Sequence, residues 1–233
     1  LLVSDKGYRG VIIQLYRNFS NISVEGNEIC ASSGALLSQI AAAARNASLT
    51  GFEFAGGIPG TLGGAVFMNA GAYGGELKDV LKEAVVMTEQ GEILTLPVEK
   101  LDMGYRTSRI KKAGYLVLEA RLVLEQGDMD KIRDITKDLT EKRVSKQPLE
   151  YPSAGSTFKR PEGYFAGKLI MDAGLRGYQV GDAQVSEKHC GFVINKGNAT
   201  AADVLTLIEN VREKVQEQFG VTLEPEVKFL GEF

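Results

Sequence analysis

The residues best suited to chemistry in this 233-residue chain form three groups, of which a glycine run is the densest. The segment GIPGTLGGAVFMNAGAYGG lies within a stretch from Phe54 to Gly75 that has no charged side chain, although charged residues make up 24% of the chain. Nine of the 27 glycines fall between Gly51 and Gly75. Glycine lets a ligand approach backbone N–H groups with no Cβ in the way, so the run predicts a site for phosphate or a planar cofactor.

The glycine run also has an alternative explanation, and it lacks two familiar fingerprints. A helix that packs closely against a sheet would give the same composition. The chain has no GxGxxG motif, and GYFAGKL has neither the spacing of a P-loop nor a Ser or Thr after its Lys. The run therefore predicts neither a Rossmann site nor a P-loop site.

The other two groups are GYRTSR and YPSAGSTFKRP. Arg106 of GYRTSR lies near the end of an expected loop, where most arginines are simply solvated. Ser156 precedes a strand-like segment that carries Lys159 and Arg160. A hydroxyl beside two cations suits an anion site or proton donation, and a turn serine among surface charges is the alternative. The motif G-x-S-x-G is absent, because phenylalanine occupies its last position.

The single histidine and the two cysteines predict no further site. His189 adjoins Cys190 on an expected strand, where neighbouring side chains point to opposite faces, so a Cys–His dyad is not expected. Cys30 lies far from Cys190 in the sequence, and neither has metal-ligand spacing. We therefore expect no disulfide framework, no metal site and a reducing, cytoplasmic setting.

Composition excludes several classes of partner. The net charge is -3 and the pI is about 5.4, which argues against a nucleic-acid or anionic-membrane surface. The only long uncharged segment is the glycine run, whose glycine density is unsuited to a membrane-spanning helix. With 44% apolar residues, we expect a soluble globular protein.

The pattern of elements predicts an α+β fold with two lobes. Three prolines in PLEYPSAGSTFKRPEGYF mark a loop that starts a new lobe near Gln147. The hydrophobic patterns predict helices over 35–48, 128–147, 165–174 and 200–220, a helical turn opened by Pro97, a hairpin over 83–96, and further strands at 11–15, 27–32, 115–126, 178–186, 189–197 and 221–231.

Four stretches resemble one known family over essentially the whole chain. GIPGTLGGAVFMNAGAYGGE, GYRTSR, YPSAGSTFKRPEGYFAGKLI and LEPEVKFLG occur in that order and are similar to UDP-N-acetylenolpyruvoylglucosamine reductase, also called UDP-N-acetylmuramate dehydrogenase. The resemblance implies an FAD enzyme of bacterial peptidoglycan precursor synthesis that reduces a UDP-sugar enolpyruvyl ether with electrons from NADPH. The short spacing between GYR and AGS resembles the subtype that lacks a substrate-capping loop.

The resemblance also implies a domain organisation. Residues 1–146 would form an FAD-binding domain, residues 147–220 a smaller α+β substrate-binding domain, and residues 221–233 a strand returning to the active site and the FAD domain. In the family, a glycine-serine-asparagine pyrophosphate loop directly precedes the segment that here reads LLVSDKGYRG. We therefore expect this chain to begin just after that loop, with most of the first FAD subdomain upstream of it.

Site residues follow from the same resemblance. Arg106 and Glu226 would stabilise an enolate-like intermediate, and Ser156 would give a proton to the α-carbon. The flavin and its pyrophosphate would lie against Gly57, Ile58, Pro59, Gly60, Thr61, Gly64, Asn69, Gly71 and Ala72, while the UDP diphosphate would be held by Lys159, Arg160 and Lys168.

The residues alone are also compatible with two other functions. Another FAD-linked oxidase of the same flavin-binding superfamily would keep the glycine run but not the AGSTFKRP block. A non-catalytic UDP-sugar binding protein would be colourless and indifferent to NADPH.

Overall fold

The computed structural model describes residues 1–233 as two compact units. Unit 1 comprises Leu1–Ile12 and Val144–Phe233, and unit 2 comprises Ile13–Arg143. The first residues belong to unit 1 because β1 (Leu2–Val3) pairs in parallel with β15 (Phe229–Leu230). Unit 2 therefore differs at its start from the expected domain 1–146, and the binding roles of the domains stay predictions.

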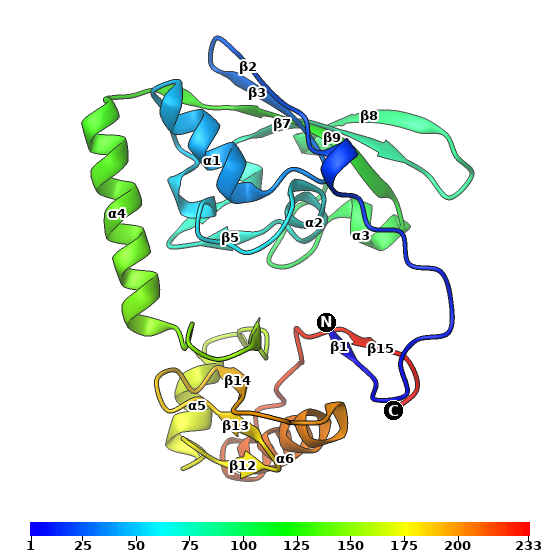
Figure 1. Ribbon diagram of the computed structural model, residues 1–233, viewed down its shortest axis with the longest axis vertical. Coiled ribbons are helices and arrows are strands. Elements are labelled where there is room, and N and C mark those ends of the chain that lie inside the picture. The colour runs from blue at the N-terminus through cyan, green and yellow to red at the C-terminus, as the bar shows by residue number, and fades with distance from the viewer. The chain divides into compact units, whose positions relative to one another are not determined.

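Unit 2 is built on a five-stranded antiparallel sheet (Figure 1). In β3, Ile29 and Ala31 are buried while Cys30 between them is partly exposed, which is the alternation of a sheet with one covered face. The strands in spatial order are β2 (Ile22–Glu25), β3 (Glu28–Ser32), β9 (Leu116–Val123), β7 (Leu81–Met87) and β8 (Ile93–Pro97).

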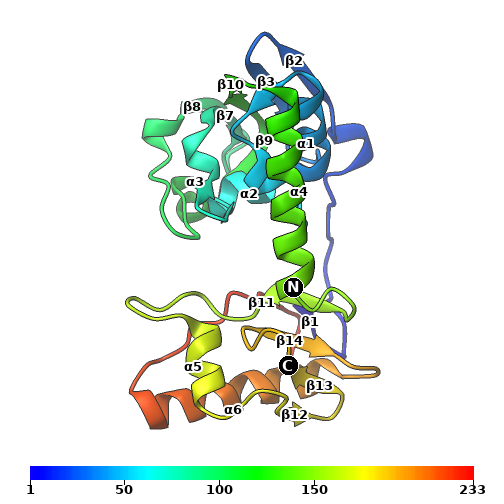
Figure 2. The ribbon, with the colours of Figure 1, turned by 90° about the vertical axis from the view of Figure 1, so that its left-hand side faces the viewer.

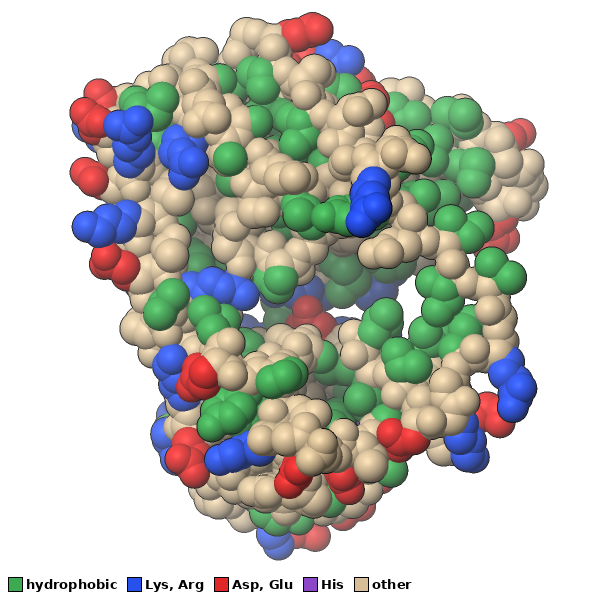
Figure 3. Space-filling view, viewed as in Figure 1, with side chains coloured by type: hydrophobic (Ala, Val, Ile, Leu, Met, Phe, Trp, Pro, Cys, Tyr) green, Lys and Arg blue, Asp and Glu red, His purple; other side chains and the backbone are tan.

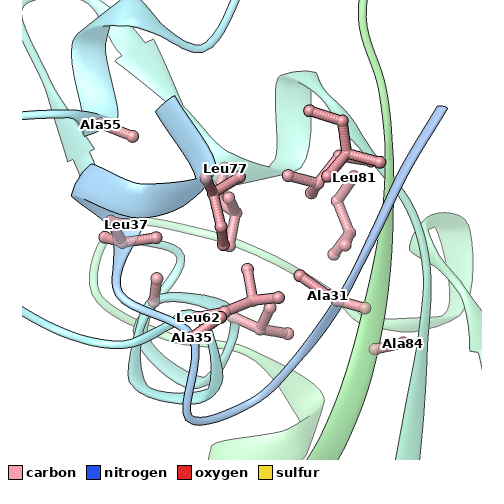
Figure 4. Close-up of a cluster of buried hydrophobic side chains, with 14 of the residues drawn as sticks. Ala31, Ala35, Leu37, Ala55, Leu62, Leu77, Leu81 and Ala84 are labelled. Atoms are coloured by element: carbon pink, nitrogen blue, oxygen red, sulfur yellow. The ribbon is translucent and has the colours of Figure 1, made fainter. Parts of the chain in front are cut away.

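Two helices of unit 2 supply the other side of its core. Leu37 of α1 and Leu62 of α2 are fully buried among sheet residues such as Leu81 (Figure 4). Both helices contact β3, and α2 also contacts β9. The helices of this unit are α1 (Leu37–Asn46), α2 (Leu62–Met68), α3 (Arg109–Ala113) and α4 (Met129–Lys146), whose last residues enter unit 1.

The glycine run folds as a chain of short elements. It contains α2 and a hairpin in which β5 (Gly71–Ala72) and β6 (Gly75–Glu76) are joined by a two-residue turn. The two turn residues have φ of 53° (Tyr73) and 90° (Gly74), the positive values that the type I′ hairpin turn needs. The remaining short elements of unit 2 are β4 (Leu49–Thr50), β10 (Glu125–Gln126) and the 3₁₀ helices η1 (Arg17–Phe19), η2 (Glu53–Ala55), η3 (Leu77–Asp79) and η4 (Val98–Lys100).

Most of the expected elements of unit 2 are confirmed, and one is wrong. The hairpin of β7 and β8 turns at Gly91, whose φ is 83°, and η4 begins directly after Pro97. The strand expected at Val11–Leu15, which begins in unit 1 and ends in unit 2, is absent, and Val11 is 87% exposed. No strand of this chain pairs with that segment, so its apolar pattern has no buried face to occupy.

Unit 1 is a smaller α+β unit with its own core (Figure 2). Its four-stranded antiparallel sheet packs against two helices through apolar residues such as Ile170, Leu207 and Val185. The strands in spatial order are β11 (Ser153–Ser156), β14 (Phe192–Asn195), β13 (Ala183–Val185) and β12 (Gln179–Val180), and the helices are α5 (Ala166–Asp172) and α6 (Ala201–Phe219).

The ends of unit 1's elements follow from local chemistry. α6 begins with a capping box, in which Thr200 Oγ1 accepts a hydrogen bond from the Asp203 N–H, and it ends at Gly220 in the left-handed conformation. The strand expected over 221–231 is reduced to β15 and one isolated bridge at Pro225. Pro225 has no N–H to donate, which limits the ladder there. Neither unit contains a helix with the length and apolar composition that a membrane-spanning segment needs.

Candidate active site

Close packing explains several glycines of the run. A Cβ placed on Gly63 would lie 2.8 Å from the Cβ of Ser33, and one placed on Gly75 would lie 2.7 Å from the ring of Phe54. A Cβ on Gly71 would lie 2.8 Å from the Gly75 carbonyl oxygen. At these positions the fold itself requires glycine, as the close-packing alternative predicted.

Packing does not explain Gly60 and Gly64. Both are exposed, neither has a positive φ, and a Cβ at either position would meet no atom within 4 Å. Gly64 lies inside α2, where glycine costs about 1 kcal/mol relative to alanine. Since neither conformation nor packing requires these two glycines, we attribute them to a ligand that approaches the backbone closely.

The surface around these two glycines suits a flat, uncharged cofactor face. Gly57 and Pro59 are also exposed, while Ile58 and Thr61 are half-buried. Figure 3 shows hydrophobic and uncharged atoms over most of this part of unit 2, with a Lys or Arg side chain among them. The N–H of Ile58 donates to the Ala55 carbonyl, so Ile58 offers the surface its apolar side chain rather than a backbone donor.

The N–H groups that open α2 are likewise partly used by the fold. Leu62 donates to the Ala35 carbonyl at 2.9 Å and Gly63 donates to the Ser33 carbonyl at 2.8 Å. The surface at Gly60 and Gly64 therefore lets a ligand come close to the backbone, but it does not offer the ligand every N–H group at the start of α2.

Arg106 is brought against the far end of the same run. It lies on a turn closed by hydrogen bonds between Gly104 and Thr107, and its φ is 54°. Its Nη2 lies 3.5 Å from the Gly71 carbonyl oxygen, and its guanidinium carbon lies 5.0 Å from the centre of the Tyr105 ring. Arg106 and the predicted cofactor residue Gly71 are therefore neighbours in unit 2.

Asn69 and Glu76 join the run to this turn. Asn69, at the C-cap of α2, has a φ of 46°, is 1% exposed and donates to the Glu76 carboxylate at 2.9 Å. Glu76 also pairs with Lys78 at 2.8 Å, and this pairing, followed by the Asn69 bond and the charge of Arg106, holds the pKa of Glu76 below its usual value. Glu76 is therefore ionised and contributes negative charge beside Arg106.

In unit 1, the structure places Ser156 and Glu226 on neighbouring segments. Glu226 N–H donates to the Thr157 carbonyl at 2.8 Å, and Lys159 N–H donates to the Glu224 carbonyl at 2.9 Å. Ser156 is exposed, whereas Thr157 beside it is buried and accepts a hydrogen bond from Val193 N–H through Oγ1. The buried threonine fixes the segment that presents Ser156.

The three cations expected at the diphosphate already have partners within unit 1. Lys159 forms an ion pair with Glu224, and Lys168 pairs with Asp172 at 2.7 Å one turn further along α5. The Arg160 guanidinium lies 3.9 Å from the centre of the Phe165 ring. The Lys168–Asp172 pair is exposed, and such pairs contribute little to stability, so a phosphate can compete for Lys168.

The structure corrects the placement of His189, which lies in a loop between β13 and β14 rather than on a strand. Its Nδ1 accepts a hydrogen bond from Gly191 N–H at 3.1 Å, and burial lowers its pKa. Burial also raises the pKa of the Cys190 thiol, and that of Cys30 to about 11. Neither cysteine is therefore primed as a nucleophile.

Sequence reasoning missed Ser108, which is fully buried and donates through Oγ to the Phe67 carbonyl at 2.8 Å. The same Oγ accepts from Lys111 N–H and caps α3. A serine directly before RIKKA is the signal of an N-cap that could have identified it.

Comparison with known proteins finds relatives along the whole chain. Residues 147–230 match the family "UDP-N-acetylenolpyruvoylglucosamine reductase, C-terminal domain", and residues 1–97 match the family "FAD binding domain". UDP-N-acetylenolpyruvoylglucosamine reductases from Agathobacter rectalis and Clostridium botulinum (strain Eklund 17B) are each 60% identical to this chain. Both alignments cover 100% of this chain, and they cover 78% and 76% of those proteins.

A solved structure agrees with these relatives. The crystal structure of UDP-N-acetylenolpyruvylglucosamine reductase from Thermus caldophilus matches with a TM-score of 0.86 at 36% identity, covering 98% of this chain and 81% of that chain. The glycine run lies within the FAD binding domain match, and its bare, uncharged surface at Gly60 and Gly64 fits FAD. The chain belongs to the UDP-N-acetylenolpyruvoylglucosamine reductase family, whose members are oxidoreductases with an FAD-binding domain.

Proposed function

We propose that this chain reduces the enolpyruvyl double bond of UDP-N-acetylenolpyruvoylglucosamine to give UDP-N-acetylmuramate, with FAD as cofactor and NADPH as electron donor. The relatives that carry the reductase name support the reaction class. The observation that carries the proposal is Arg106, which lies against Gly71 at the end of the uncharged glycine run, where Gly60 and Gly64 present bare backbone. A fixed cation beside an apolar cofactor face suits the reduction of a substrate that carries a carboxylate.

Gly60 and Gly64 would hold FAD through their bare backbone, and Gly57 through an exposed backbone beside Arg143, with Pro59 and Ile58 as a flat apolar wall. FAD, when bound, supplies the electron pair and one of the two hydrogens that the double bond takes up. Because no side chain at Gly60 or Gly64 stands above the backbone, the ring can lie close to the peptide groups.

Arg106 would stabilise the negative charge that develops on the substrate, and Glu226, the second residue that the resemblance assigns to this step, would help to polarise the substrate. Reduction at the terminal carbon leaves negative charge on the α-carbon and its carboxylate, and the Arg106 guanidinium can pair with that carboxylate. A preorganised charged donor of this kind typically contributes about 10²- to 10³-fold to a rate. The left-handed backbone and the Tyr105 contact restrict the orientations open to Arg106 before substrate arrives.

Ser156 would supply the second hydrogen as a proton. Its Oγ–H bond breaks as a C–H bond forms at the α-carbon, and solvent returns the proton to the serine. Serine is a weak acid, so it needs to stand directly beside a strongly basic carbon. Its exposure, next to the buried Thr157, leaves the hydroxyl accessible to substrate.

Lys159, Arg160 and Lys168 would bind the UDP diphosphate. Each phosphoryl oxygen could replace a carboxylate partner such as Glu224 or Asp172. This assignment follows from charge and the family resemblance.

The test is turnover of the FAD-loaded enzyme without oxygen. We expect NADPH absorbance to fall only when UDP-N-acetylenolpyruvoylglucosamine is present, with one product molecule formed per NADPH. UDP-N-acetylglucosamine, which lacks the enolpyruvyl group, is the matched control and should give no oxidation. No oxidation without oxygen, followed by equal NADPH oxidation with both sugars once oxygen is admitted, would instead indicate an oxidase.

A further inference from the structure

Both polar atoms of the Asn69 side chain already have partners within the protein. Its Nδ2 donates to the Glu76 carboxylate at 2.9 Å and to the Gly104 carbonyl at 3.1 Å, and its Oδ1 accepts from Lys78 N–H at 3.0 Å. With only 1% of the residue exposed, these protein partners account for both polar atoms. An amide in this position serves the fold around it.

Two of the bonds near the end of α2 reach the turn that carries Arg106. Asn69 bonds the Gly104 carbonyl, which opens the turn, and Ser108 Oγ donates to the Phe67 carbonyl just after the turn closes. Both Asn69 and Ser108 are buried, so the two bonds are protected from competition by water. We call this pair of bonds the turn clamp.

The turn itself needs such support. Its third residue is Arg106, whose φ of 54° belongs to a position that type II turns usually give to glycine or asparagine. A strained non-glycine residue persists where the surroundings over-determine its conformation, and such residues gather at functional sites. Lys111 adds a third tie, because its Nζ donates to the Arg106 carbonyl at 3.0 Å.

We propose that Asn69 and Ser108 are positioning residues, which fix the Arg106 turn to the C-terminal end of α2 and so set where the guanidinium stands relative to the glycine surface. The inference rests on the proposed role of Arg106 in reducing the enolpyruvyl substrate. It assigns the side chain of Asn69 to the fold, and the expectation that the residue lies against the cofactor stays a prediction. α2 contains Gly64 at one end and meets the clamp at the other, so one short helix aligns the cofactor surface with the catalytic cation.

The variants that test the clamp are Asn69→Gly and Ser108→Ala. Glycine accepts the left-handed backbone of position 69, so Asn69→Gly removes the side-chain bonds without adding backbone strain. Asn27→Gly is the matched control, because Asn27 Nδ2 makes a single bond of the same kind to the Leu124 carbonyl at 3.1 Å, and Asn27 has no part in the proposed site.

The first measurement is hydrogen exchange at the Gly104 and Thr107 amides, which does not depend on activity. We expect both clamp variants to exchange about tenfold faster at these amides, the change expected from losing one or two hydrogen bonds, and Asn27→Gly to leave them unchanged. Unchanged protection in both clamp variants would overturn the inference, even if the proposed reaction itself proved wrong.

The second measurement separates positioning from cofactor contact in the FAD-loaded enzyme. We expect Asn69→Gly to keep FAD affinity and reduction by NADPH, and to slow reoxidation by substrate about 10- to 100-fold, as misplacement of a catalytic group does. In an Arg106→Ala background, Asn69→Gly should slow reoxidation by less than about twofold more, because it acts only through Arg106. Weaker FAD binding with both half-reactions slowed equally would overturn the inference in favour of a direct contact.

Discussion

The Arg106 turn and the Ser156 segment hold their functional side chains in different ways. The turn is anchored by buried polar residues, with Asn69 only 1% exposed and Ser108 fully buried. Ser156 is itself exposed, and the anchor beside it is Thr157, whose backbone and hydroxyl are bonded to Gly191 and Val193. Hydrogen bonds from Asn69 and Ser108 hold the turn on both sides of Arg106. In unit 1 only the neighbouring residue Thr157 is anchored, and Ser156 itself is exposed.

This difference has a consequence for how each region responds to ligand. Buried, fully bonded groups keep one arrangement with or without a ligand, so the Arg106 turn is preorganised. In unit 1 Lys168, one of the cations expected at the diphosphate, is held by an exposed ion pair with Asp172, which substrate can displace at little cost. Substitutions near the turn should therefore displace the Arg106 guanidinium, while substitution of Ser156 should slow proton transfer and leave the fold unchanged.

Ser156→Ala is the change for which we expect the largest effect. Removing the proton donor should slow reoxidation of the reduced enzyme by substrate about 10²- to 10⁴-fold, while NADPH still reduces the flavin normally. Because Ser156 is exposed, the free energy of unfolding should change by less than about 0.5 kcal/mol. Stopped-flow flavin absorbance and urea denaturation measure the two quantities.

Ser156→Cys is the control for this prediction, since a thiol can still give a proton and should recover part of the lost rate. Normal reoxidation in Ser156→Ala would leave this residue as an ordinary turn serine. A marked loss of stability would show that Ser156, like the turn clamp, belongs to the scaffold.

The sequence predicted most elements, because they depend on local patterns. The β7–β8 hairpin follows from strand alternation around Gly91, and α6 follows from an apolar face between Thr200 and Gly220. The Val11–Leu15 strand failed because a strand also needs a partner, which no local pattern supplies. The expected residues Gly60, Gly64 and Arg106 came from the resemblance, and their roles stay predictions.

Tertiary contacts explain what the sequence could not give. Gly63 and Gly64 are adjacent glycines that the sequence does not distinguish. Only the structure shows that a Cβ on Gly63 would meet Ser33, whereas a Cβ on Gly64 would point into open space. The turn clamp joins residues 35 and 41 positions apart along the chain, so no motif contains it.

Arg106 provides a second test, because its side chain and its backbone can be separated. Arg106→Ala should slow the substrate half-reaction about 10²- to 10³-fold and leave reduction by NADPH intact. Arg106→Gly should show the same kinetic loss yet be more stable than Arg106→Ala by up to about 1 kcal/mol, because glycine relieves the positive φ. Equal stability of the two variants in urea would mean that the turn carries no backbone strain.

The smallest expected effects concern two adjacent glycines of α2. Close packing requires glycine at position 63, whereas at position 64 we attribute it to a ligand. Gly63→Ala would place a Cβ 2.8 Å from Ser33 and should lower the free energy of unfolding by about 1–3 kcal/mol through overpacking. Gly64→Ala meets no atom within 4 Å and should raise it by about 0.5–1 kcal/mol, because alanine favours the helix.

Gly64→Ala should weaken FAD binding even though it stabilises the apoprotein. If the ring approaches the bare backbone there, Gly64→Ala should raise the FAD dissociation constant about tenfold, a loss of ~1.4 kcal/mol, although the apoprotein is more stable. Thermal melts of both apoproteins and a flavin titration of Gly64→Ala measure these effects. A Gly64→Ala protein that binds FAD as tightly as the wild type would remove the reason for placing the cofactor on this surface, because neither packing nor conformation requires glycine there.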